Sequence, residues 1–180
     1  MEPGAKFSTA GSAALFVAVG VLFFLRGRQV DSADFMDPVT LNDWLAVLGF
    51  SLALICLAVA LPVYAGLTGD RTTYRTSLVP ATGSVLGGVS NVLEDGLSWS
   101  WAFWVFVASA LLINVGLLAL TVVMAWRGRG VGRLLAGVPA GTLVGVLLFE
   151  ASGGVILLVT WSAAALVPMR LPRGADMPPA

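Results

Sequence analysis

The sequence contains no histidine and only one cysteine, Cys56. Histidine is the commonest metal ligand and the commonest general base, so its absence removes most metal-dependent and acid–base chemistry. A single cysteine cannot form an internal disulfide or a paired-cysteine redox or zinc site. We therefore predict no bound metal and no cofactor, and any catalysis would have to rely on carboxyl groups.

Charge is also scarce, at 11% of 180 residues, whereas soluble domains carry about 25%. Ten basic residues balance ten acidic residues, so the chain has no basic excess for nucleic-acid phosphates. Hydrophobic residues make up 58% of the sequence. This composition excludes a soluble enzyme, a nucleic-acid binder and a disordered chain, and it predicts the lipid bilayer as a partner.

Long apolar runs predict an all-α fold, a polytopic bundle of transmembrane helices in one domain at residues 1–171. A bilayer core of about 30 Å requires roughly 20 apolar residues per helix. The weakest run, 78–93, is rich in glycine, serine and threonine and suits a bundle interior. A turn at Ser152-Gly153-Gly154 would divide the last apolar stretch into two spans. The predicted spans are 7–25, 44–67, 78–93, 99–126, 134–150 and 153–168, followed by a flexible cytoplasmic tail at 172–180.

The distribution of basic residues favours six spans with both termini in the cytoplasm. Cytoplasmic loops carry the excess of lysine and arginine, and six spans place eight of the ten basic residues inside. Arg26 and Arg28 are the exceptions. Four spans would place the arginines of 127–133 outside. Nine arginines and one lysine, with abundant alanine, glycine and valine, are typical of a GC-rich bacterial genome, so we predict a multi-pass protein of the bacterial plasma membrane.

Small residues recur at four-residue spacing in several predicted spans. Such spacing lets helix backbones approach closely in lipid, either within one bundle or between subunits of a homo-oligomer. We favour packing within the bundle. The repeats are Ala10, Ala14 and Ala18; Gly83 and Gly87; and Gly137, Gly141 and Gly145.

Two local patterns concern where helices begin and break. Pro62 and Pro139 lie inside predicted spans and should kink or break their helices. The segment Thr40-Leu41-Asn42-Asp43 has the pattern of a capping box, which makes Asp43 a helix-start residue.

Polar residues near the outer ends of the spans predict a binding vestibule. Asn91, Glu94, Asn114 and Glu150 would give it a net negative charge, and Trp99, Trp101 and Trp104 would wall it. Carboxylates and aromatic faces attract cations, so a small cationic solute is favoured. Each residue also has a simpler explanation. The tryptophans fit an interfacial belt, Asn114 fits a helix–helix contact, and Glu150 fits a loop acid.

The string Gly66-Leu67-Thr68-Gly69-Asp70-Arg71, with Arg75 beyond it, resembles the loop between the second and third spans of major facilitator transporters. The resemblance implies that Asp70, Arg71 and Arg75 form a loop whose charge contacts stabilise one conformational state. The chain departs from that family in having six predicted spans where the family has twelve, and in lacking an arginine in the fourth span.

Two broader resemblances concern layout. The whole chain resembles uncharacterised six-span membrane proteins of actinobacteria, which implies no activity. Its size and the alanine spacing of the first span are also similar to the substrate-binding subunits of energy-coupling-factor importers.

These observations favour a protein that handles a small solute, as a transporter, a channel or a substrate-binding membrane subunit. One alternative is a scaffold or assembly subunit that works with a partner membrane subunit. The other is an intramembrane enzyme, similar to terpene cyclases or isomerases, in which Glu150, Glu94 or Asp95 with a raised pKa acts as a general acid.

Overall fold

The computed structural model describes residues 9–29, 38, 40–128, 131–149 and 152–170, and every regular element in these ranges is helical. A π-helical turn, η1, continues the third helix. The elements are α1 (Thr9–Gln29), α2 (Leu41–Gly66), α3 (Arg71–Asn91), η1 (Val92–Gly96), α4 (Ala102–Arg127), α5 (Val131–Leu134), α6 (Gly137–Leu147) and α7 (Gly153–Arg170).

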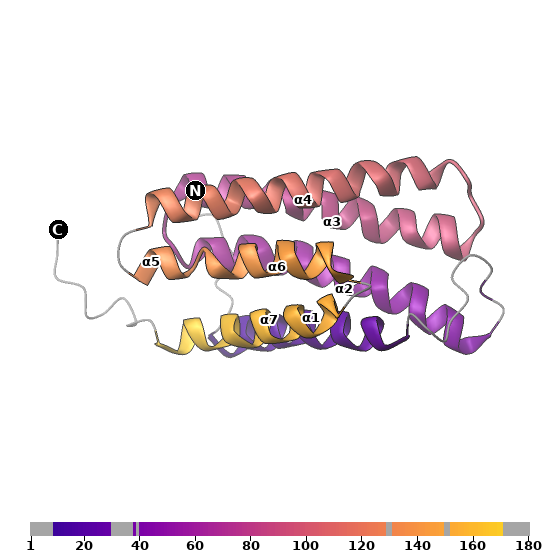
Figure 1. Ribbon diagram of the computed structural model, residues 1–180, viewed down its shortest axis with the longest axis horizontal. Helices are drawn as coiled ribbons and strands as arrows, with labels where there is room; N and C mark the ends of the chain where they lie inside the picture. Colours follow the sequence, from indigo (N-terminus) through magenta and orange to yellow (C-terminus); the bar gives the residue numbers. More distant parts are fainter. Residues whose placement is uncertain (1–8, 30–37, 39, 129–130, 150–151, 171–180) are drawn as a thin grey trace.

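The six longer helices form a closed ring in the order α1, α2, α3, α4, α6 and α7, with α7 packed against α1. Successive helices run in opposite directions (Figure 1). The α2–α3 and α4–α5 connections therefore lie together at one end, which we call the Asp70 end. The opposite end, where η1 leads to α4, is called the Asp95 end. The arginines of α3, α5 and the end of α4 gather at the Asp70 end.

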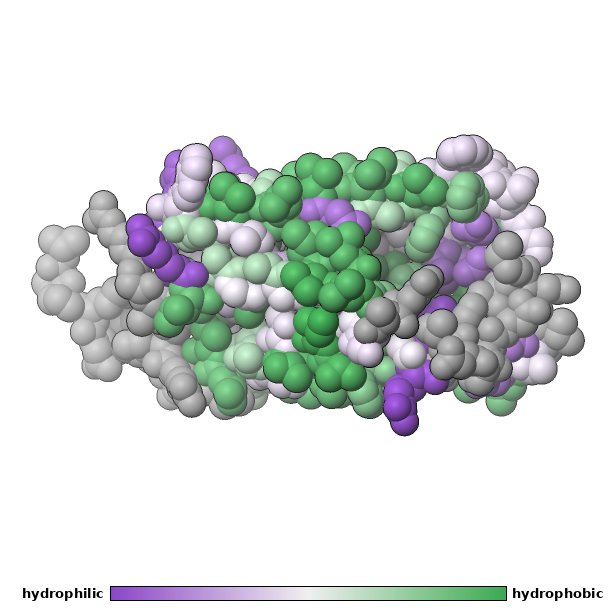
Figure 2. Space-filling view, viewed as in Figure 1, coloured by the Kyte–Doolittle hydropathy of each residue, from purple (hydrophilic) through white to green (hydrophobic). Residues whose placement is uncertain are grey.

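Three helices are long and apolar enough to cross a membrane: Thr9–Arg28, Leu41–Gly66 and Ala102–Arg127. Apolar side chains also cover most of the middle of the molecular face in Figure 2, apart from a small hydrophilic patch, and more hydrophilic residues lie toward its two ends. Large exposed side chains on these helices include Leu25, Leu52 and Leu111, each more than half exposed. An apolar surface of this extent indicates a membrane protein.

The third helix has its polarity inverted relative to a helix of a soluble protein. From Leu78 onward most of its outward residues are apolar, with Leu78, Val85 and Val89 between 42% and 50% exposed. Its buried face is made of small and polar residues, among them Thr73, Ser77, Pro80, Ala81, Gly83, Ser84, Gly87, Gly88, Ser90 and Asn91. This buried glycine and serine content explains why α3 is not apolar enough to count among the three spanning candidates. The helix predicted at 78–93 is part of α3, which begins earlier, at Arg71, and which has an exposed apolar face as well as a buried one.

Two helices begin at side-chain caps. The Asp43 carboxylate accepts hydrogen bonds from the Thr40 backbone N–H at 2.8 Å and the Thr40 hydroxyl at 2.7 Å. The Asp43 backbone N–H donates to Thr40 Oγ1, which completes the predicted capping box. Asp70 caps α3 in the same way, by accepting from the Thr73 N–H at 2.8 Å.

The last apolar stretch forms a short hairpin. The chain breaks between α5 and α6, and Pro139 lies in the first turn of α6, where its missing N–H breaks no helical hydrogen bond. Pro62 was predicted to kink or break its helix, and α2 continues through it without a break. The predicted turn before α7 is present: Ser152 has a φ of 95°, and the Gly153 N–H donates to the Leu148 carbonyl at 2.8 Å.

Glycines bring neighbouring helices into close contact. A Cβ on Gly145 would lie 2.6 Å from Leu157 of α7, and one on Gly141 would lie 2.5 Å from the Thr160 hydroxyl. Gly116 of α4 faces Pro80 of α3 at a similar distance. Gly141 and Gly145 therefore serve packing within the chain, as predicted, whereas Gly137, the third glycine of that repeat, meets no heavy atom within 4 Å.

The alanine repeat of α1 behaves differently, because Ala10 and Ala14 are exposed.

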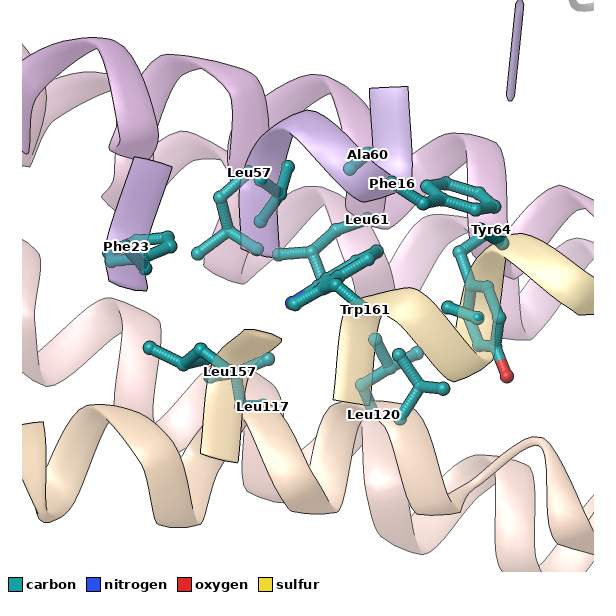
Figure 3. Packing of buried hydrophobic residues seen from close by; sticks show 14 of the residues in the cluster. Phe16, Phe23, Leu57, Ala60, Leu61, Tyr64, Leu117, Leu120, Leu157 and Trp161 are labelled. Atoms are coloured by element: carbon teal, nitrogen blue, oxygen red, sulfur yellow. The ribbon is translucent and has the colours of Figure 1, made fainter. Parts of the chain in front are cut away.

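An aromatic cluster fills the core toward the Asp70 end. Trp161 of α7 is fully buried, and its ring lies 5.5 Å from that of Phe16 and 6.2 Å from that of Tyr64. Leu57, Leu61 and Leu157 surround the tryptophan (Figure 3). The Tyr64 hydroxyl donates to the Leu135 carbonyl at 3.0 Å, which ties α2 to the segment before α6. The side chains of this aromatic cluster are therefore almost completely buried.

Candidate functional site

A partly open cavity of about 180 Å³ lies between helices of the ring. Its walls come from α1, α2, α4 and α6, together with Phe149, which follows the end of α6. The lining is almost entirely apolar. It consists of Phe23, Phe50, Leu54, Phe106, Ser109, Ala110, Ile113, Asn114, Val146 and Phe149.

Four of the lining residues are phenylalanines, which we call the phenylalanine cluster: Phe23, Phe50, Phe106 and Phe149. They come from α1, α2, α4 and the segment just after α6. The Phe50 ring meets all the others, at centroid distances of 6.3 Å to Phe23, 5.9 Å to Phe149 and 6.4 Å to Phe106. These distances lie in the range of favourable edge-to-face and tilted aromatic contacts. The cluster presents several aromatic faces and edges to whatever occupies the cavity.

Asn114 of α4 gives the cavity its unpaired polar group. Its side-chain NH₂ donates to the Ala110 carbonyl at 2.8 Å. Its Oδ1 atom is buried and finds no hydrogen-bond partner in the described part of the chain. Leaving such an acceptor unpaired costs about 1–3 kcal/mol. Asn114 is therefore a lining residue that holds an unpaired hydrogen-bond acceptor.

The other polar lining residue is already committed within its own helix. The Ser109 hydroxyl donates to the Phe106 carbonyl at 2.6 Å. Of these two polar lining residues, only Asn114 has a side-chain atom without a hydrogen-bond partner in the described part of the chain.

The size of the cavity suits a single ring or a short branched chain. A dry cavity of about 150 Å³ lined by leucine, isoleucine and phenylalanine binds benzene. The present cavity is slightly larger than that reference. It can hold a benzene-sized group.

Charged groups lie next to the cavity. The guanidinium carbon of Arg26 is 5.5 Å from the centroid of the Phe50 ring. Burial, with a smaller contribution from the neighbouring Glu94, raises the pKa of the Asp95 carboxyl to about 6, and Arg26 opposes that rise. Burial likewise raises the pKa of Glu94. Because Arg26 already occupies the cation site over Phe50, the cluster is poorly suited to a second cation.

The residues of the predicted vestibule differ in their relation to the cavity. Among those that the structure describes, Asn114 alone lines the cavity. Trp99, Trp101 and Trp104 are exposed, at 48%, 54% and 71%, and Glu94 and Asp95 are part of η1. Glu150 lies outside the described residues.

Asn91 has a structural contact. Its side-chain NH₂ donates to the Val47 carbonyl at 3.2 Å and to Ser51 Oγ at 3.1 Å. Asn91 is buried, and both acceptors belong to α2. The side chain therefore links α3 to α2.

The predicted conformational loop contains an ion pair that the sequence did not indicate. Asp70 Oδ1 lies 3.4 Å from Nη1 of Arg127 at the end of α4. Hydrogen bonds from the Thr73 side chain and backbone, together with Arg127, lower the pKa of Asp70. Arg71 and Arg75 are exposed.

Sequence reasoning missed the phenylalanine cluster. Each phenylalanine sits in an apolar run, where nothing local indicates which neighbour its ring will meet. Only Asn114 stood out, because an amide near the middle of a span needs a partner.

Comparisons with known proteins add no further constraint: no family model, no curated protein and no solved structure matches the chain. Within the described ranges, no group of three or more histidine, cysteine, aspartate or glutamate side chains could hold a metal ion.

Proposed function

We propose that the protein is a six-span membrane protein that binds a small solute in its phenylalanine-lined cavity, as the binding site of a transporter or of a substrate-binding membrane subunit. The buried, unpartnered Oδ1 of Asn114 carries this proposal. An acceptor of this kind is costly in an apolar interior unless a ligand or water satisfies it. A purely structural bundle would gain stability by replacing it.

Six spans are supported by the inverted polarity of α3 and by the length of the last hairpin. With α5 included, the segment 131–147 rises about 25 Å, and α7 rises about 27 Å over its 18 residues. These rises approach the thickness of a bilayer core of about 30 Å. The gathering of arginines at the Asp70 end supports a cytoplasmic location for that end and for both termini in a bacterial plasma membrane.

The structure favours a neutral solute over the cation that the sequence suggested. The acidic groups Glu94 and Asp95 do not line the cavity, and Arg26 lies over Phe50. An uncharged ring or chain would bury its apolar surface without a desolvation penalty for charge.

Binding can be tested with fluorobenzene as the probe. We expect the protein in lipid nanodiscs to give a saturable ¹⁹F NMR signal for bound fluorobenzene. The Ala110→Phe substitution, which fills the cavity, should abolish that signal. The matched control is Ala108→Phe on the exposed side of the same helix, which should retain it.

Circular dichroism would verify that both variants keep the helical content of the wild type. Equal binding by the two variants, or no saturable binding by the wild type, would contradict the proposal.

A further inference from the structure

The cavity lies directly behind the contact between α4 and α6. Five of its ten lining residues belong to α4, and Val146 and Phe149 come from α6 and the residues just after it. Among the described residues, no lining side chain comes from α3 or α7. The α4–α6 contact is therefore the part of the ring that separates this side of the cavity from the surroundings.

That contact lacks the interactions that hold the neighbouring contacts together. Gly116 of α4 faces Pro80 of α3, and Gly141 and Gly145 of α6 face α7. Neither helix thus presents a described glycine to the other. In the described ranges no hydrogen bond joins α4 to α6 either, whereas Asn91 joins α3 to α2. Only side-chain packing holds α4 and α6 together.

The contact is also short. The 11 residues of α6 rise about 16 Å, whereas the 26 residues of α4 rise about 39 Å. Figure 1 shows α6 and α7 ending well before the Asp95 end that α3 and α4 reach. Val146 and Phe149 lie where α6 stops, so the cavity is at the end of the α4–α6 contact rather than deep within it.

The outer surface next to this contact is apolar. Leu111 and Leu118 lie three positions before and four positions after Asn114, on the same side of α4, and they are 62% and 54% exposed. Leu147 of α6, next to Val146, is 65% exposed. An opening between α4 and α6 at this level would meet lipid acyl chains.

We infer that the solute enters the cavity sideways from the bilayer, between α4 and α6, and that it is a lipid-soluble molecule whose single hydroxyl group donates a hydrogen bond to Asn114 Oδ1. This inference rests on the proposed function. The phenylalanine cluster takes the apolar ring or chain, and the amide oxygen selects molecules with a donor over pure hydrocarbons. In such an interior an unpaired hydrogen-bond donor or acceptor costs more free energy than it does in water. A ligand that supplies the missing partner therefore gains affinity over one that does not.

The donor requirement is tested with 4-fluorophenol and fluorobenzene, which differ by one hydroxyl group. We expect the wild type in nanodiscs to prefer 4-fluorophenol by about tenfold after correction for partition into lipid, the value for one neutral hydrogen bond. Asn114→Leu keeps the approximate shape but removes the acceptor, so it should abolish the preference while fluorobenzene still binds. An unchanged preference in Asn114→Leu would overturn the assignment of Asn114.

The route is tested with 4-hydroxybenzenesulfonate, whose charge keeps it in water on both faces of the nanodisc. It should fail to displace 4-fluorophenol. Exchange of bound 4-fluorophenol should also slow when the surrounding lipid is cooled below its chain-melting temperature. Displacement of 4-fluorophenol by the sulfonate would overturn lateral entry. So would an exchange rate of 4-fluorophenol that does not change when the lipid chains freeze. Both results leave binding itself intact, whereas absence of binding by either neutral probe would instead contradict the proposed function.

Discussion

The Asp70 carboxylate joins the start of α3 to the end of α4. One of its oxygens accepts hydrogen bonds from the Thr73 backbone and hydroxyl, and the other lies 3.4 Å from Arg127 Nη1. A single side chain thus caps α3 and also contacts the end of α4. The two functions can be separated, because asparagine caps a helix nearly as well as aspartate but carries no charge.

We expect Asp70→Ala to lower the thermal stability of the protein more than Asp70→Asn does, because only the alanine removes the cap. Arg127→Gln should resemble Asp70→Asn and have a small effect, since exposed ion pairs contribute little. Thermal unfolding in detergent, followed by circular dichroism, measures the three differences. Equal losses in Asp70→Ala and Asp70→Asn would show that charge rather than capping is what matters.

The pH dependence of this site has a definite sign. The fold lowers the pKa of Asp70 below its ordinary value of 3.8. Its contribution is therefore fully present above that value and is lost as the pH falls through the lowered folded pKa. Wild type and Asp70→Asn should differ in stability at pH 6 and converge in strong acid.

The glycine contacts of the last hairpin predict a sharp positional contrast. Gly145→Ala places a Cβ 2.6 Å from Cγ of the buried Leu157, and this overlap should cost about 1–3 kcal/mol. Gly137→Ala, in the same helix, meets no heavy atom within 4 Å and should cost nothing. Denaturant unfolding of the two variants gives both values. Similar stabilities for the two variants would mean that α6 and α7 do not pack as described.

Much of the fold could be predicted from the sequence because its signals are local. The capping box at Thr40, the turn before α7 and the break near Pro139 each depend on a few adjacent residues. The helix at residues 78–93 was harder to predict, because its glycines and serines are explained only by the close packing of α2 and α4 against it.

The site could not be predicted in the same way. The cavity joins Phe23, Phe50, Phe106 and Phe149 from four segments, and their meeting depends on helix rotation and depth. The predicted vestibule used polarity as its guide, and it therefore selected Asn91, whose polar atoms serve α2. Asn114 was selected for the same reason and does reach the cavity. The difference between these two asparagines depends on neighbouring helices, which no single span encodes.

Asn91 and Asn114 should therefore respond differently to substitution. Asn91→Ala removes the hydrogen bonds to Val47 and Ser51, and it should lower stability by about 1 kcal/mol, typical of a polar contact between membrane helices. It should leave the preference for 4-fluorophenol unchanged. Ser51→Ala, which removes one of the two acceptors, should have a smaller effect in the same direction. A change in ligand preference without a loss of stability would instead assign Asn91 to binding.

Asp95 should titrate in an unusual range. Its pKa is raised to about 6, chiefly by burial, with Glu94 adding to the rise and Arg26 opposing it. Since the folded pKa exceeds the ordinary value of 3.8, ionisation of Asp95 opposes folding. Stability should therefore fall as the pH rises from about 4 to about 6 and change little above that range. Asp95→Asn should remove this dependence and be more stable than the wild type at pH 8.

The neighbouring charges provide matched controls for that titration. Glu94→Gln removes a like charge and should lower the midpoint of Asp95, whereas Arg26→Gln removes an opposing charge and should raise it. ¹³C NMR of labelled aspartate carboxyls follows the midpoint directly in each variant. A midpoint near 4 in the wild type, unmoved by either substitution, would place Asp95 in water, away from both Glu94 and Arg26. The opposite shifts of the two variants are the stronger test, because a general change in solvent exposure would move both midpoints in the same direction.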